Sequence, residues 1–148
     1  MSTDEDVPFE ITHEVRDGCL CLHARRAARS LARRFDEALR PIGLTNGQFS
    51  LMMALNRPAP PRIGPVAELL AMDRTTLTAA LKPLERRGLV KVMADPEDRR
   101  GRLMKLTRAG RDLLAKAVPI WRETHTKLDE LLPGRDAERL RSDLRALS

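Results

Sequence analysis

Two adjacent arginines, Arg99 and Arg100, stand in the stretch ADPEDRRGRLMKLT, which runs from residue 94 to residue 107. Five of the six residues from Asp95 to Arg100 are charged, and an alternating apolar segment follows them. Alternation of this kind predicts a strand, so the charged residues are expected at the tip of a short β-hairpin. Such a tip is either a solvated turn or a binding site for an anionic partner.

The segment just before this hairpin carries a second set of residues that suit an anionic partner. In RTTLTAALKPLERR, residues 74–87, leucines recur at helical spacing and predict the buried stripe of a helix. Its first turns then present threonine hydroxyls, which are short enough to let a helix enter a DNA major groove about 12 Å wide. Three threonines within four positions are poor helix formers, which disfavours an ordinary amphipathic helix. The candidate DNA-binding residues are Arg74, Thr75, Thr76, Thr78, Lys82, Arg99 and Arg100.

Helices are also predicted ahead of this segment. Apolar residues recur at steps of three and four from about residue 17 to residue 40, where Pro41 and Gly43 end the helix. Thr45 and Gln48 then form a predicted capping box for a second helix. The prolines of RPAPPR end that second helix, because proline cannot continue the backbone hydrogen bonding.

A helix-turn-helix is predicted next. A short helix covers about residues 65–71, Asp73 caps the threonine-bearing helix, and Gly88 closes that helix. Strands over residues 89–94 and 102–107 flank the charged tip. A two-stranded hairpin directly after a helix-turn-helix makes a winged helix, so the hairpin is the wing.

The wing position indicates which partner the tip arginines suit. Beside a recognition helix in the major groove, a wing reaches the neighbouring minor groove, where narrow geometry concentrates the negative potential that attracts arginine. Asp98 is expected to support the wing by pairing with an arginine, while Arg100 points outward. A DNA-binding role for the hairpin tip is therefore favoured over a merely solvated turn.

Further helices complete the predicted fold. Thr107 caps a long helix that runs to about residue 131, with Pro119 as an expected kink, and a last helix runs to Leu147. The fold class is therefore mostly α with a small β-wing. It is a winged helix-turn-helix flanked by N-terminal and C-terminal helices.

The charge distribution favours the same partner. The net charge is +6, and residues 1–17 hold six acidic residues and one arginine, so the other 131 residues carry +11. A basic body behind a short acidic leader favours a polyanionic partner, nucleic acid before membrane. The polar start is unlike a signal peptide, and no apolar run approaches the roughly 18 residues of a membrane span. A cytoplasmic protein with no membrane partner is expected.

The chain resembles the MarR family of bacterial transcription regulators. The resemblance lies in the stretches LTNGQFSLMMAL, VAELLAMDRTTLTAALKPLERRGLV and DPEDRRGRLMKLTRAGRDLL. The D-x-R wing motif of the family corresponds to Asp98 and Arg100, and Gly110 also matches. The resemblance implies a homodimer on a pseudo-palindromic operator, often relieved by a ligand or an oxidant.

The apolar surface also favours a homodimer. The resemblance places residues 1–148 in one domain, with 17–43 and 108–148 as dimerisation helices and about 44–107 as the winged helix-turn-helix. Those flanking helices carry more leucine than a small winged domain can cover, and uncovered apolar surface favours a partner. The residues concerned are Leu20, Leu22, Leu128, Leu131, Leu132, Leu140, Leu144 and Leu147. A two-fold dimer would place two recognition helices about one DNA turn apart.

A small-molecule effector is the preferred regulator of DNA binding. Its pocket is predicted where the first, second and fifth helices meet, although plain core packing is the favoured account of any single residue. The predicted lining is apolar with polar anchors: Arg26, Ser30, Phe49, Met52, Met53, Trp121 and His125. No cofactor is expected.

A thiol sensor is the alternative regulator. Cys21 lies in the region where some members of the family sense hydroperoxides, but the chain has none of the tyrosines that surround such a thiol. Cys19, Cys21 and His23 lie two residues apart and would point to opposite sides of a helix. They are therefore expected to share neither a disulfide nor a metal ion, and no metal site is predicted.

Enzyme activity is disfavoured. The chain has no phosphate-binding glycine loop, nucleophile elbow or zinc-binding helix pair, and its histidines lack evident triad partners. The predicted function is a sequence-specific DNA-binding transcription regulator, a homodimeric repressor relieved by a small molecule. The alternatives are a redox regulator that uses Cys21 and a non-specific architectural nucleic-acid-binding protein.

Overall fold

The computed structural model describes residues 6–148, and the chain divides into two compact units, residues 1–34 and 35–148. The first five residues of the acidic leader lie outside the described part of the chain. Within residues 6–148, no helix combines the length and apolar character that a bilayer crossing requires.

The first unit contains a helix that the sequence pattern missed. Helix α1 spans Phe9–Gly18 and helix α2 spans Leu20–Leu39, whereas a single helix was predicted from about residue 17. Cys19 separates them in an extended conformation, with φ of −77° and ψ of 110°. The pattern failed because α1 buries none of its residues, so its segment looked like a polar leader rather than an amphipathic helix.

The second unit begins with the end of α2 and a well-capped turn. A short 3₁₀ helix, η1 (Arg40–Ile42), leads to Gly43, whose φ of +73° lies in the left-handed region that glycine adopts without strain. Helix α3 (Asn46–Leu55) follows, and the predicted capping box of Thr45 and Gln48 is confirmed.

Asp36 fastens the start of α3 to the end of α2. Its Oδ1 accepts hydrogen bonds from the Asn46 backbone N–H at 2.7 Å and from the Asn46 side-chain amide at 2.9 Å. The backbone bond, followed by the amide bond, holds the pKa of the Asp36 carboxyl below its usual value. The ionised carboxylate therefore stabilises this corner at neutral pH, and the contribution is lost as acidification protonates it.

The core of the second unit gathers around α3. This helix is apolar on nearly every side, which is typical of an element enclosed by the rest of a domain. The largest fully buried side chains are Leu39, Met52, Val66, Leu77, Leu84 and Met104. They come from α2, α3, the helix-turn-helix and the hairpin, so one core holds the helix-turn-helix and the hairpin together.

The helix-turn-helix consists of α4 (Ile63–Leu69) and α5 (Arg74–Arg86). Helix α4 begins two residues earlier than predicted and ends two residues sooner. The Asp73 cap is confirmed, since its carboxylate accepts a hydrogen bond from the Thr76 N–H. Gly88 closes the end of α5 as expected, with φ of +70° and a 3.0 Å bond from the Leu89 N–H to the Leu84 carbonyl.

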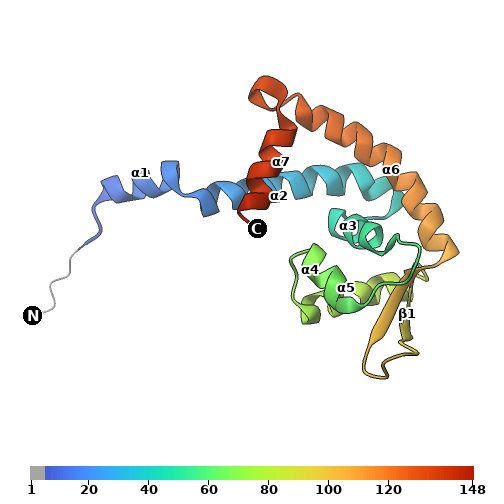
Figure 1. The fold of residues 1–148 in the computed structure, drawn as a ribbon. Helices are drawn as coiled ribbons and strands as arrows, with labels where there is room; N and C mark the ends of the chain where they lie inside the picture. The colour runs from blue at the N-terminus through green and yellow to red at the C-terminus, as the bar shows by residue number, and fades with distance from the viewer. Residues whose placement is uncertain (1–5) are drawn as a thin grey trace, which may run out of the picture. The chain divides into compact units, whose positions relative to one another are not determined.

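The hairpin follows with the predicted strands. Strand β1 (Val90–Ala94) pairs antiparallel with β2 (Arg102–Leu106), from Val90 opposite Leu106 to Ala94 opposite Arg102. Figure 1 shows this hairpin projecting beyond the helices beside α5. An isolated bridge between Arg62 and Leu103 ties the start of β2, next to the wing tip, to the segment before α4.

Helix α6 (Arg108–Asp129) leaves the hairpin under the predicted Thr107 cap and runs through Pro119 without interruption. A short 3₁₀ helix, η2 (Pro133–Arg135), leads to the last helix, α7 (Ala137–Ala146). Gly110 lies where α6 crosses the start of the hairpin. A Cβ at this position would overlap the carbonyl oxygen of Leu89, so only glycine permits the crossing.

We therefore expect Gly110→Ala to lower the free energy of unfolding by about 1–3 kcal/mol, the usual cost of overpacking. Chemical denaturation followed by circular dichroism measures this loss. Gly47→Ala is the matched control, because a Cβ there meets its nearest atom only at 4.0 Å. An unchanged midpoint for Gly110→Ala would show that the crossing is not close-packed.

Candidate nucleic-acid interface

Helix α5 presents two distinct faces. Leu77, Leu81 and Leu84 are at most 3% exposed and hold the helix against the core, as predicted. The candidate DNA-binding residues of this helix are all exposed: Arg74, Thr75, Thr76, Thr78 and Lys82. The apolar spacing therefore places these polar side chains on the solvent side of α5.

The threonine hydroxyls are not equivalent. Thr76 donates its hydroxyl to Asp73 Oδ2 at 2.8 Å and its backbone N–H to Oδ1 at 2.7 Å. These bonds, the backbone one first, hold the pKa of the Asp73 carboxyl below its usual value. Thr78 donates its hydroxyl to the Arg74 carbonyl at 2.8 Å. Among residues 6–148, no hydrogen bond uses the hydroxyl of Thr75, which leaves it available to a partner.

Arg74 extends along the preceding helix. A Cβ on Gly64 would lie 3.0 Å from Arg74 Nη2, so the guanidinium rests against the bare backbone of α4. Lys82 lies farther along α5, where it lines a shallow hollow with Glu85 and Arg86. The two cationic side chains thus lie at opposite ends of the exposed face of α5.

The wing tip differs from the prediction in one respect. Asp98 Oδ1 accepts a hydrogen bond from the Arg100 backbone N–H at 3.0 Å, and the ion pairs within residues 6–148 include none from Asp98 to an arginine. A short carboxylate reaches the N–H two residues ahead more readily than a distant guanidinium, which produces an Asx-turn. Asp98 therefore shapes the tip through the backbone, and Arg99 and Arg100 remain exposed.

The ion pair that anchors the wing was not predicted from the sequence. Asp95 is only 5% exposed, and its Oδ2 lies 2.6 Å from Nη2 of Arg62, although the N–H is poorly aligned for a hydrogen bond. Asp95 Oδ1 also accepts the Glu97 N–H at 2.9 Å. The sequence pattern counted Asp95 among the tip charges, because nothing in the local spacing reveals a partner 33 positions earlier.

The predicted effector residues fall into different surroundings. Phe49, Met53 and Trp121 line a hollow of about 550 Å³, in which the two aromatic rings stack with centroids 6.3 Å apart. The same hollow is lined by Ser50, Ala54, Leu69, Leu70, Val118 and Arg122. Of the predicted lining, these three residues are brought together.

Two predicted pocket residues have structural positions instead. Met52 is fully buried in the core, because it points about 100° around α3 from the exposed Met53. The ring of His125 lies 4.7 Å from that of Trp121 and 5.8 Å from that of Phe35, so it packs among aromatic rings.

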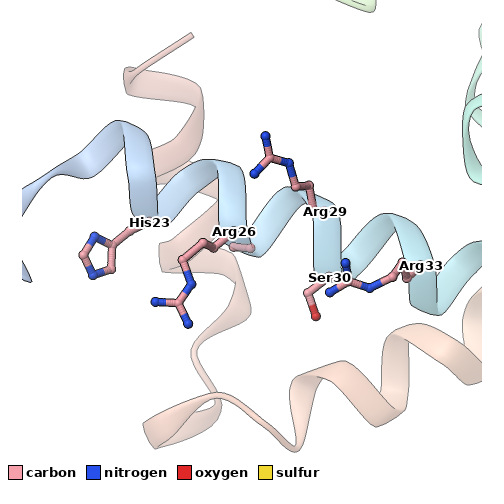
Figure 2. A pocket seen from close by; sticks show the side chains of 6 residues that line it. His23, Arg26, Arg29, Ser30 and Arg33 are labelled. Atoms are coloured by element: carbon pink, nitrogen blue, oxygen red, sulfur yellow. The ribbon is translucent and has the colours of Figure 1, made fainter. Parts of the chain in front are cut away.

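Arg26 and Ser30 belong to the first unit. They line a groove of about 600 Å³ on α2, together with His23, Ala27, Arg29 and Arg33. Figure 2 shows these side chains leaving successive turns of the helix. The residues that line this groove differ from those that line the hollow beside Trp121.

The cysteines lie at the break between α1 and α2. Cys21 is exposed and Cys19 is half-buried, and both are free thiols. Cys19 is extended rather than helical, so the helical separation assumed from the sequence does not apply to this pair. Its Sγ accepts the Leu22 N–H at 3.4 Å. Within residues 6–148, no three His, Cys, Asp or Glu side chains gather as metal ligands.

Comparisons with known proteins define the class. A sequence profile of the MarR family matches residues 44–101. The transcriptional regulator MosR of M. tuberculosis, solved in complex with DNA, is 40% identical over 87% of this chain and 92% of that chain, with a TM-score of 0.80. The transcriptional repressor CouR, solved bound to a 23-mer DNA duplex, is 30% identical over 90% and 94% of the two chains, with a TM-score of 0.80.

A curated relative matches over a shorter region. The transcriptional activatory protein BadR of Rhodopseudomonas palustris is 35% identical over 89 residues, which make up 58% of this chain and 51% of BadR. This chain thus spans about half the length of BadR.

The fold and these similarities define a transcription regulator with a winged helix-turn-helix, not an enzyme. The chain belongs to the MarR family. The sequence-based assignments of fold class and family are therefore confirmed.

We expect Arg62→Ala to lower the free energy of unfolding by about 1–3 kcal/mol, because it leaves the buried Asp95 carboxylate without its cation. The double variant Arg62→Ala/Asp95→Ala should cost less than the sum of the two single variants, as a double-mutant cycle would measure. Lys105→Ala, on the exposed side of β2, is the control and should change stability little. Strict additivity of the pair would refute the anchor.

Proposed function

We propose that this protein is a sequence-specific DNA-binding regulator that acts as a homodimer on a pseudo-palindromic operator. The observation that carries the proposal is the pairing of an exposed, hydroxyl-rich start of α5 with a wing whose two tip arginines are exposed. Figure 1 shows the wing projecting from the second unit beside α5. DNA-bound structures of MosR and CouR support a duplex as the partner.

The residues divide between base reading and backbone contact. Thr75 is proposed to meet base edges in the major groove, since its hydroxyl and methyl group are both free to do so. Lys82 and Arg74 are proposed to meet phosphates or base edges at the two ends of the helix. Arg100, with Arg99 beside it, is proposed to enter the minor groove.

The two symmetric half-sites require a dimer. Leucines of the flanking helices remain exposed in the single chain, including Leu20 at 70%, Leu131 at 59%, Leu144 at 48% and Leu147 at 70%. Helix α7 buries none of its residues, which a ten-residue helix could not sustain alone in water. We assign these surfaces to the dimer, and residues 17–43 and 108–148 to the dimerisation helices.

Relief by a small molecule is the proposed mode of control, and repression is the proposed action. The hollow beside Trp121 touches the end of α4 through Leu69 and Leu70, so an occupant there could shift the helix that supports α5. Its lining is mainly apolar with one cation, Arg122, which suits a small apolar or aromatic acid. Repression is supported by the name of CouR, whereas BadR is named an activator.

DNA selection from a random pool tests the function directly. We expect an enriched inverted repeat whose half-sites lie about one DNA turn apart. Recovery of unrelated sequences with no repeat would instead support an architectural protein. Arg100→Ala should weaken binding to the selected site by about 1–3 kcal/mol in a band-shift titration, without altering the oligomeric state.

Thr75→Ala and Thr76→Ala provide a matched pair on one turn of α5. Thr75→Ala should change the selected base preference, because its hydroxyl is free. Thr76→Ala should mainly lower the melting temperature, because its hydroxyl is engaged by Asp73. Identical selected motifs for Thr75→Ala and the wild type would refute the assignment to the major groove.

Trp121 is the only tryptophan of the chain, so its fluorescence reports on the hollow without labelling. Titration with a series of small aromatic acids should change this emission saturably for at least one member and release selected DNA at the same concentrations. Arg122→Ala should weaken that response, whereas Arg108→Ala, on the exposed start of α6, should not. DNA release without an emission change would locate the effector elsewhere.

A further inference from the structure

The groove on α2 carries concentrated positive charge that its own chain leaves unpaired. Arg26, Arg29 and Arg33 line it, and the sequence has no acidic residue between Asp17 and Asp36. No arginine of this stretch takes part in the ion pairs found within residues 6–148. Like charges at steps of three and four repel each other on a helix, so the bare groove weakens α2 unless an anionic partner covers it.

Helix α1 carries the complementary pattern. Glu10, Glu14 and Asp17 follow at steps of four and three, which places the three carboxylates on one face. All three are exposed. Asp17 is paired with Arg16 at 2.8 Å, so Glu10 and Glu14 carry the carboxylates of this face that enter none of the ion pairs found within residues 6–148. Glu10 to Asp17 and Arg26 to Arg33 each span seven positions, a rise of about 10 Å on both helices.

An apolar stripe accompanies the acidic face. Ile11 and Val15 lie one helical turn apart beside Glu14, and they are 43% and 51% exposed. Helix α1 has ten residues, none of them buried, whereas isolated helices shorter than about 12–15 residues are marginal in water. This helix therefore needs a surface that covers its apolar stripe and matches its charge.

The surface cannot come from α2 of the same chain. Only Cys19 separates the two helices, and they follow one another nearly in line (Figure 1). Two helices that pack antiparallel need a connecting loop of about 2–5 residues. The Cys19 N–H and carbonyl are also held by Val15 and His23, at 3.0 and 3.1 Å, so the single joint is not a free turn.

We propose that the acidic face of α1 docks on the arginine groove of α2 in a second copy of this chain. The docking is reciprocal, because each chain has one helix α1, here called the acidic arm, and one groove on α2. It would cover Ile11 and Val15 of both arms. This inference rests on the homodimer proposed above. It specifies which surfaces meet between the first unit of one copy and the first unit of the other.

Charge reversal tests the pairing in the full-length protein. The arm variant is Glu10→Arg/Glu14→Arg, and the groove variant is Arg26→Glu/Arg33→Glu. Each alone places like charges across both contacts, so self-association measured by analytical ultracentrifugation should weaken roughly tenfold. Arg25→Glu/Arg34→Glu is the matched control, because these exposed arginines lie on the same helix but do not line the groove. It should dimerise as the wild type does.

Mixing the variants distinguishes pairing between chains from pairing within one chain. In a heterodimer of the arm and groove variants, both contacts again join opposite charges, so native mass spectrometry should show the heterodimer in excess over both homodimers. The excess should fall as salt is raised, since exposed charge pairs are screened. A chain that carries both reversals should regain wild-type self-association.

Other outcomes would overturn the inference. Recovery in the doubly reversed chain without a heterodimer excess would place the contact within one chain. If both variants dimerise as tightly as the wild type, the proposed dimer stands, but the acidic arm and the groove are not part of its interface. Inorganic pyrophosphate that raises the melting temperature of the wild type but not of the groove variant, with dimerisation unaffected, would assign the groove to a free anion. A monomeric wild type would refute the proposed dimer itself.

Discussion

The junction at Thr107 and Gly110 is the constraint on which the DNA-reading unit depends. Thr107 donates its hydroxyl to the Gly88 carbonyl at 2.6 Å and its N–H to the Leu89 carbonyl at 3.0 Å, while its Oγ1 caps the start of α6. Gly110 then lets α6 pass directly over Leu89. The end of the recognition helix, the first strand of the wing and the long C-terminal helix are therefore fixed at one point. A displacement of α6 reaches α5 and the wing through hydrogen bonds rather than through a flexible linker.

The polar groups of the interface separate into those that shape the structure and those that remain free. Asp73 and Thr76 satisfy each other at the start of α5, Asp98 holds the backbone of the wing tip, and Asp95 anchors the wing to Arg62. These carboxylates therefore stabilise the fold itself, because each accepts a hydrogen bond from a backbone N–H group. The cations and one threonine hydroxyl remain exposed, and exposed cations are what a polyanionic duplex requires.

Charge is segregated along the chain as well as across its surface. Residues 1–17 hold six acidic residues and one arginine, whereas arginines concentrate on the following helix and on the helix-turn-helix with its wing. In the proposed dimer on DNA, the arginines have two roles: one set contacts nucleic acid and the other contacts carboxylates of the partner copy. The proposed docking of α1 would also keep the groove of α2 from competing for DNA.

Local sequence by itself determined most of the elements of this protein. The capping residues Thr45, Asp73 and Thr107, the helix-ending glycine at 88 and the alternation in both strands are short-range signals, because each depends on bonds between residues only a few positions apart. The resemblance in these same segments identified the family. Helix α1 escaped prediction because its apolar stripe consists of only Ile11 and Val15, too few to stand out from the acidic residues around them.

Only the tertiary structure decided which of the polar residues are free. The pairing of Arg62 with Asp95 joins positions 33 apart, and the separation of Met52 from the hollow beside Trp121 depends on how α3 is rotated within the core. Spacing along the chain cannot supply this information, because burial and pairing are set by neighbours that folding brings together. The sequence therefore determined the class of the protein and the chemistry of its surface, and the packing determined which side chains remain free to contact a partner.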